Sequence, residues 1–326
     1  MPGAQGDGFP RPEAGIHPRP PSVRPPERAR WQPSNLALRL MTAAVLVPPV
    51  LWVCYVGGLW YVAMVIVFSS LAINEFYGFI AAKGGTPNRL LGTLAAAALP
   101  LIVYVGDAFL ATSFMTAVLL TVMLLQLTHA QIREAMMSVS ATFFGVFYVG
   151  WLLAHAVSVR FIAEDLSRRH PALEFDPQLG FFFIIFCLVA AVFSDAGAYF
   201  VGRRFGRRKL APAISPNKTL EGVLGGVVAG TLGCLSAKFV FDELIPGRLS
   251  AELSYMAAGL FGGVLAVVAV LGDLVESVLK RDAHLKDAGR ILPGVGGVLD
   301  RVDSALLAIP IMYYMLLAYY YLRYAV

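Results

Sequence analysis

The chain has 326 residues, of which 58% are hydrophobic and 14% are charged, and its formal net charge at pH 7 is +5. Soluble domains usually carry about 25% charged residues, so this composition excludes an ordinary soluble enzyme and predicts an integral membrane protein. The three cysteines, Cys54, Cys187 and Cys234, fall in separate apolar runs. They are interpreted as core residues and not as a disulfide or metal framework.

Residues 1–33 hold nine of the 20 prolines and five arginines. This composition cannot bury a core, so we predict a disordered tail followed by a transmembrane domain over 34–326. The apolar run after the tail lacks an A-x-A-like cleavage pattern. It is therefore predicted to be a first span and not a removed signal peptide.

Apolar runs of roughly 20 residues are long enough to cross a bilayer as helices. About nine can be placed, and they divide into an N-terminal group over 36–161 and a catalytic group over 180–326: 36–56, 59–80, 90–105, 108–128, 141–161, 180–201, 222–241, 254–279 and 303–322. The alternation that a membrane β-barrel requires is not found in the sequence. The predicted fold class is an all-α polytopic membrane protein.

Lysine and arginine are enriched in cytoplasmic loops. If the amino terminus lies inside, the inner connections hold fourteen of these residues and the outer connections with the C-terminal segment hold four. We therefore predict a bacterial-type inner membrane protein with its N-terminus in the cytoplasm, its C-terminus outside and its polar site on the cytoplasmic side.

Three polar side chains share one stripe of the eighth predicted span. Asp273, Glu276 and Lys280 are spaced i, i+3 and i+7, which places them on one face of a helix. A carboxylate inside a membrane helix costs about 2.5 to 3.5 kcal/mol on insertion scales and normally has a partner. The stripe is either a structural ion pair at a helix end or a metal or substrate site.

Asp300 and Asp303 open the ninth predicted span just after Gly296 and Gly297. Carboxylates at a helix start can simply favour the helix dipole. Here two carboxylates share one face of the helix, and the preceding helix can add those of Asp273 and Glu276. This arrangement indicates instead an oxygen-rich site for a hard cation such as Mg²⁺. A His/Cys cluster that would favour zinc is absent from the sequence.

A third polar block spans residues 193–222, in which Asp195 lies within the sixth predicted span and a basic run follows it. The basic run is either a topological signal or, together with the turn "SPNKT", a phosphate-binding segment. Glu75, late in the second span, either lines the site or forms a structural pair. Gly222, Gly226 and Gly230 repeat every four residues and predict close helix packing.

The segment Ser277–Asp303, "SVLKRDAHLKDAGRILPGVGGVLDRVD", resembles the signature of phosphatidate cytidylyltransferases (CDP-diacylglycerol synthases). The segments "SDAGAYFVGRRFGRRKLAPAISPNKTLEG" and "GDLVES" are similar to other recurring segments of that family. The family pattern has histidine immediately before the Gly-Gly pair, and this chain has Val295 there. The matched carboxylates and cationic residues are retained.

The resemblance implies a Mg²⁺-dependent enzyme of phospholipid biosynthesis that converts CTP and phosphatidate into CDP-diacylglycerol and pyrophosphate. It implies Asp273 and Asp300 as principal metal ligands, with Asp303 and Asp195 in support. The implied phosphate contacts are Lys280, Arg281, Lys286, Arg301 and Lys218. Further residues implied to line the substrate site are Ser194, Thr219, Glu276, Ser277, Asp287, Gly296 and Gly297.

Two other functions remain open at this stage. A CTP-dependent lipid kinase of the dolichol or phytol type would also bind CTP beside a membrane lipid, but would release a phospholipid and CDP. An ion-coupled transporter would use intramembrane carboxylates without a basic loop beside them. The expected partners are CTP, phosphatidate and membrane lipid, without nucleic acid, and both a second cation and a homodimer are left open.

Overall fold

The computed structural model describes residues 35–127, 135–245, 252–285, 287–289, 291 and 296–324, with side chains from residue 41. The predicted tail lies outside these residues. The same is true of four single residues: Arg133, Lys286, Arg290 and Val295. Residues 35–326 form one compact unit.

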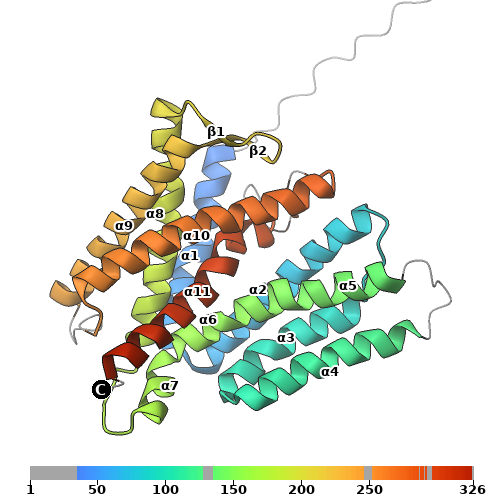
Figure 1. The fold of residues 1–326 in the computed structure, drawn as a ribbon, viewed down its shortest axis with the longest axis horizontal. Helices are drawn as coiled ribbons and strands as arrows, with labels where there is room; N and C mark the ends of the chain where they lie inside the picture. The colour runs from blue at the N-terminus through green and yellow to red at the C-terminus, as the bar shows by residue number, and fades with distance from the viewer. Residues whose placement is uncertain are drawn as a thin grey trace, which may run out of the picture. The chain divides into compact units, whose positions relative to one another are not determined.

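Helices dominate this unit, as predicted (Figure 1). In chain order the elements are α1 (Asn35–Val56), α2 (Gly58–Ala82), α3 (Arg89–Val105), α4 (Ala108–Gln126), α5 (Ala135–Gly145), the π-helix η2 (Val146–Trp151), α6 (Leu152–Arg160), α7 (Ile162–Arg169), α8 (Leu179–Phe205), β1 (Lys209–Ala211), β2 (Ser215–Thr219), α9 (Leu220–Glu243), α10 (Tyr255–Asp282) and α11 (Leu299–Tyr324).

Within the described part of the chain, seven helical segments are long and apolar enough to span a membrane. They are Gly58–Ala82, Ala108–Gln126, Ala135–Arg160, Leu179–Phe205, Leu220–Glu243, Tyr255–Asp282 and Leu299–Tyr324. Two shorter apolar helices, Met41–Val56 and Arg89–Val105, coincide with the first and third predicted spans. The all-α membrane fold is confirmed, and the count of nine spans stays a prediction.

A two-stranded antiparallel ribbon between α8 and α9 was not predicted. Strands β1 and β2 pair Lys209 with Thr219 and Ala211 with Ser215. The side chain of Thr219 then caps α9 by accepting a hydrogen bond from the Gly222 N–H over 3.1 Å. The ribbon therefore sets where the basic segment ends and where α9 begins.

Helices α8 and α10 pack against each other, and each also packs against α9 and α11. Helix α11 also contacts α2 and α6. The four-residue glycine repeat of α9 packs closely against neighbouring helices, as predicted, and Gly222 and Gly226 face α8. A Cβ atom on Gly226 would lie 2.8 Å from the carbonyl oxygen of Ser194, and one on Gly222 would lie 2.9 Å from that of Ala198. Small residues thus bring α9 close to the part of α8 that carries Ser194 and Asp195.

One of the two buried apolar clusters joins the N-terminal helices to the segment that links α10 and α11. It includes Phe76 and Tyr77 of α2 and Tyr148 of η2, together with Val298 and Leu299 at the start of α11. The N-terminal helices are therefore packed directly against the segment that carries the predicted site.

Candidate functional site

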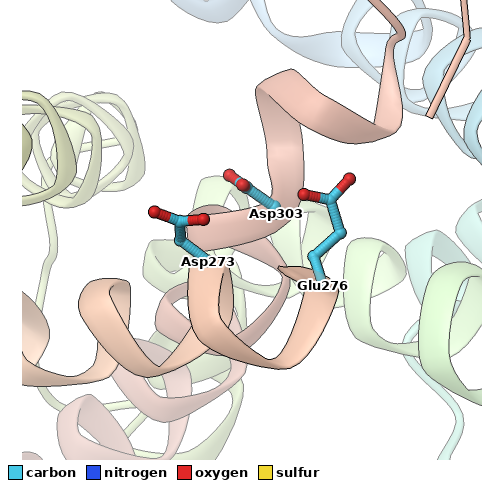
Figure 2. A group of neighbouring side chains, drawn as sticks. All are labelled: Asp273, Glu276 and Asp303. Carbon is cyan, nitrogen blue, oxygen red and sulfur yellow. The ribbon is translucent and has the colours of Figure 1, made fainter. Parts of the chain in front are cut away.

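Three carboxylates converge where α10 meets α11 (Figure 2). Asp273 and Glu276 extend from one face of α10, and Asp303 extends from the second turn of α11. One oxygen from each residue lies within 4.8 Å of the others. Glu276 is fully buried, whereas Asp273 and Asp303 are half-buried. Carboxylates from the last two predicted spans therefore converge in the fold, with Asp303 and not Asp300 in the group. These three residues are called the acid group below.

The close approach of the two helices depends on Gly272. A Cβ atom at this position would lie 2.6 Å from the carbonyl oxygen of Asp303 and 3.0 Å from the Cα atom of Ser304. A larger residue at position 272 would push α11 away from α10 and separate Asp303 from Asp273.

Two lysines neutralise part of the negative charge. Lys218, from β2, places its Nζ atom 2.7 Å from a carboxylate oxygen of Asp273. Lys280 lies one turn after Glu276 on α10. Its Nζ atom is 2.6 Å from Oε2 of Glu276 and 2.8 Å from Oδ1 of Asp300. Because four carboxylates share two ammonium groups, the site keeps a formal excess of negative charge that would attract a cation.

Asp300 lies beside the acid group but turns toward the loop before α11. Its carboxylate accepts hydrogen bonds from the backbone N–H groups of Ala288 and Gly297, each over 2.9 Å, in addition to the contact with Lys280. Gly296 precedes this contact with φ +102°, a backbone conformation that residues with a side chain disfavour. The geometry thus gives Asp300 a role in shaping the loop, and its predicted role as a metal ligand stays a prediction.

Glu75 reaches the same loop from α2. Its Oε2 atom accepts a hydrogen bond from the backbone N–H of Leu299 over 2.7 Å. Gly289 and Gly297 lie directly against this carboxylate, and a Cβ atom on Gly297 would come within 2.6 Å of Oε2. Glu75 thus anchors the start of α11, and a place for it in the lining of the site stays a prediction.

The remaining predicted residues occupy several kinds of position. Asp195 lies close enough to Asp273 and Asp303 to interact with both electrostatically, although it is not part of the acid group. Ser277 donates to Asp273 over 3.3 Å. Ser194 donates to the carbonyl oxygen of Ala266 over 3.1 Å and joins α8 to α10.

The outer members of the predicted set are more exposed. Arg281 donates to the carbonyl oxygen of Ile214, in the turn between β1 and β2, over 3.2 Å. Asp287 is exposed in the loop, and Arg301 is exposed on α11. Lys286 lies outside the described residues.

An apolar cavity of about 600 Å³ has Arg301 in its lining. Side chains from α1, α2, α6, α8 and α11 line it, among them Val50, Met64, Ala156 and Ala305. Arg301 is the one charged side chain in this lining of described residues. The cavity therefore places an apolar volume next to the cationic side chain of Arg301 and to the helix that carries Asp303.

The acid group fits a divalent cation on chemical grounds. Its donors are all carboxylate oxygens, which hard cations such as Mg²⁺ prefer. The Oε1 atom of Glu276 is buried and has no hydrogen-bond partner among the described residues. A buried charged oxygen without a partner is costly, and coordination to a cation would remove that cost.

Comparisons with known proteins agree with this chemistry. A family model described as the cytidylyltransferase family matches residues 37–319. The phosphatidate cytidylyltransferase of Brucella suis biovar 1 (strain 1330) is 33% identical over 282 residues, which are 86% of this chain and 93% of that protein.

Two shorter alignments have a higher sequence identity. The phosphatidate cytidylyltransferase of Bacillus subtilis (strain 168) is 45% identical over 139 residues, which are 43% of this chain and 49% of that protein. The protein of the same name from Haemophilus influenzae (strain ATCC 51907 / DSM 11121 / KW20 / Rd) is 37% identical over 163 residues, 50% of this chain and 55% of that protein. This chain thus spans about half the length of these two relatives.

Proposed function

The chain belongs to the cytidylyltransferase family, and on this premise we propose that it transfers the cytidylyl group of CTP to phosphatidate. In this reaction a phosphate oxygen of phosphatidate bonds to the α-phosphorus of CTP. The bond from that phosphorus to the oxygen shared with the β-phosphorus breaks. The products are CDP-diacylglycerol and pyrophosphate. The observation that carries the proposal is the acid group with its two lysines, set beside an apolar cavity.

The proposed cation is Mg²⁺, held by Asp273, Glu276 and Asp303. When bound, it would offset the repulsion between two anionic substrates and the charge that develops on the departing pyrophosphate. Asp195 lies near enough to support the site electrostatically. Asp300 holds the loop through Ala288 and Gly297.

The cationic side chains are proposed to bind phosphate oxygens. Lys218 and Lys280 already lie at the acid group, so each can contact an anion bound there. Arg281 and the predicted contact Lys286 are assigned to the triphosphate, with Ser277, Thr219, Asp287 and the glycines of the loop lining that side. Positioning and charge suffice for transfer between phosphates, since the attacking oxygen is already ionised near neutral pH and does not require a dedicated base.

The apolar cavity is proposed to take an acyl chain of phosphatidate. Its lining is almost entirely apolar, and Arg301 at its edge could pair with the lipid phosphate. Such an arrangement would hold the lipid phosphate beside Asp303 while the chain stays out of water. A CTP-dependent lipid kinase would also use these features. The reaction products therefore distinguish the two functions.

The relatives named above are bacterial, and the apolar helices mark a membrane protein. We place the chain in the bacterial inner membrane with the acid group on the cytoplasmic side, where CTP is available. The cytoplasmic N-terminus in this proposal rests on the distribution of lysine and arginine in the sequence, and a homodimer is left open.

The test uses purified protein in detergent with phosphatidate and CTP labelled at the α-phosphorus. The expected result is labelled CDP-diacylglycerol that forms with Mg²⁺ and disappears with EDTA. Phosphate transfer to a lipid alcohol with release of CDP would support the lipid kinase instead. No labelled lipid from phosphatidate at any Mg²⁺ concentration would refute the proposal.

A further inference from the structure

Tyr148 lies in a π-helical turn between α5 and α6. In this turn the Leu152 N–H donates to the carbonyl oxygen of Phe147, five residues earlier. Such turns shift the side chains around them and occur frequently at functional sites. The turn belongs to the N-terminal helices, far in sequence from the signature segment.

The ring of Tyr148 is fixed by aromatic neighbours. It stacks on Phe144 with a centroid distance of 5.4 Å and an interplanar angle of 4°, and it contacts Phe76 at 5.9 Å. The residue is only 4% exposed. The orientation of the ring is therefore set by packing and does not depend on its hydroxyl group.

The hydroxyl oxygen of Tyr148 is buried and has no hydrogen-bond partner among the described residues. The same holds for Oε1 of Glu276. Tyr148 packs in the same buried cluster as Val298 and Leu299, where α11 begins. The charges of Glu276 and Asp303 act on its hydroxyl group from the acid group. Buried polar atoms are nearly always bonded in native proteins, and one without a partner costs about 1 to 3 kcal/mol.

We propose that the Tyr148 hydroxyl donates a hydrogen bond to an oxygen atom bound to the cation at Glu276 and Asp303. This inference rests on the proposed function, which supplies the cation. Glu276 Oε1 would then be satisfied by the cation, and the hydroxyl by the oxygen that the cation carries. That oxygen belongs either to water or to a substrate phosphate, because both accept hydrogen bonds.

The test compares two variants that each remove one buried hydroxyl. Tyr148→Phe keeps the ring stack. Tyr320→Phe is the matched control, because the hydroxyl of Tyr320 is also buried without a partner among the described residues, and its side chain is only 1% exposed. Tyr320 lies 17 positions after Asp303 on α11, roughly 26 Å along the helix.

Two readouts are measured for each purified variant. The first is kcat and KM for CTP and for phosphatidate as Mg²⁺ is varied. The second is the shift in the thermal unfolding midpoint that Mg²⁺ causes without substrate. We expect Tyr148→Phe to lower kcat/KM by about 10- to 100-fold, the factor for one lost hydrogen bond to a charged group. Its midpoint in EDTA should equal or exceed that of the wild type, because the buried hydroxyl has no partner among the described residues when the cation is absent. Tyr320→Phe should match the wild type in rate.

The midpoint shift identifies the source of the oxygen. A smaller Mg²⁺-induced shift in Tyr148→Phe would identify cation-bound water, and an unchanged shift with a lower rate would identify a substrate phosphate. Wild-type rates in Tyr148→Phe would overturn the inference, as would a lower midpoint in EDTA, which would indicate a structural hydroxyl. If the wild type forms no CDP-diacylglycerol, the proposed function fails, while the midpoint measurement still tests the contact of Tyr148.

Discussion

The carboxylate of Glu75 on α2 accepts a hydrogen bond from the backbone N–H of Leu299, the first residue of α11, over 2.7 Å. These residues are 224 positions apart. The bond therefore fixes the start of α11, and with it Asp300 and Asp303, against a helix of the N-terminal group. Replacing Glu75 by leucine should lower kcat/KM about ten-fold or more, because the buried N–H loses its acceptor and the loop loses its position.

Two variants sharpen that measurement. Glu75→Gln keeps a carbonyl oxygen that can accept from Leu299 and should retain more activity than Glu75→Leu. Asn74→Ala is the neighbouring control, because Asn74 bonds to Ser70 and Thr93 and not to the loop. Full activity in Glu75→Leu would show that the loop is held without this bond.

The spans and the carboxylates were predictable because their physical signals are local. Long apolar runs, and charged residues that are costly in a membrane, can be read one segment at a time. Spacing on α10 predicted that Asp273 and Glu276 share a face, and the structure confirms it. The ribbon β1–β2 was missed because its strands have three and five residues, too few for a pattern of alternation.

The orientation of Asp300 and the position of Tyr148 could not be predicted. Asp300 and Asp303 are equivalent by spacing, and only the folded loop shows that Asp300 meets the N–H groups of Ala288 and Gly297. A tyrosine within an apolar span is usually a core residue, so Tyr148 carried no signal. Contacts between distant segments, such as Lys218 with Asp273, require the tertiary structure.

The different surroundings of Asp300 and Asp303 predict different defects. Asp303→Asn and Asp273→Asn should remove most of the Mg²⁺-induced rise in the thermal midpoint and all measurable transfer, because each removes a charge from the proposed cation site. Asp300→Asn should also lose activity, since Lys280 and two N–H groups lose a charged acceptor. It should keep most of the Mg²⁺-induced shift.

The midpoints, measured with and without Mg²⁺ on the same purified samples, separate the two roles. Ser277→Ala is a suitable control, because it removes only a 3.3 Å hydrogen bond to Asp273 and should lower the Mg²⁺ effect slightly. Loss of the Mg²⁺-induced shift in Asp300→Asn would instead restore Asp300 as a metal ligand, as the sequence predicted.

Stability away from the site should depend on Arg160. This residue is only 3% exposed and donates to the carbonyl oxygens of Cys54, Tyr55 and Pro177 and to the side chain of Gln178. Replacement by methionine should lower the free energy of unfolding by about 2 to 4 kcal/mol, because several buried acceptors lose their donor.

That loss should appear in thermal unfolding in EDTA, without a change in the KM for CTP. Arg169→Met is the matched control, since Arg169 forms an exposed pair with Asp165 over 3.0 Å and such pairs contribute about 0 to 1 kcal/mol. Equal stability of the two variants would contradict the bracing role of Arg160.

The apolar cavity beside Arg301 predicts a dependence of the rate on acyl-chain length. Ala305 lines the cavity on α11, and phenylalanine at this position would fill part of its 600 Å³ volume. Ala305→Phe should lower kcat/KM for long-chain phosphatidate by about ten-fold, since displacing a few methylene groups at about 0.8 kcal/mol each reaches that size. Short-chain phosphatidate, which does not fill the cavity, should be affected much less.

The matched control is Val267→Phe, which adds a ring on α10 at a position that is 41% exposed and does not line the cavity. Initial rates with two chain lengths at saturating CTP give the ratio that decides the question. If Ala305→Phe slows both lipids equally, the side chain disturbs α11 and Asp303 rather than chain binding. That outcome would contradict the proposed binding of an acyl chain in this cavity.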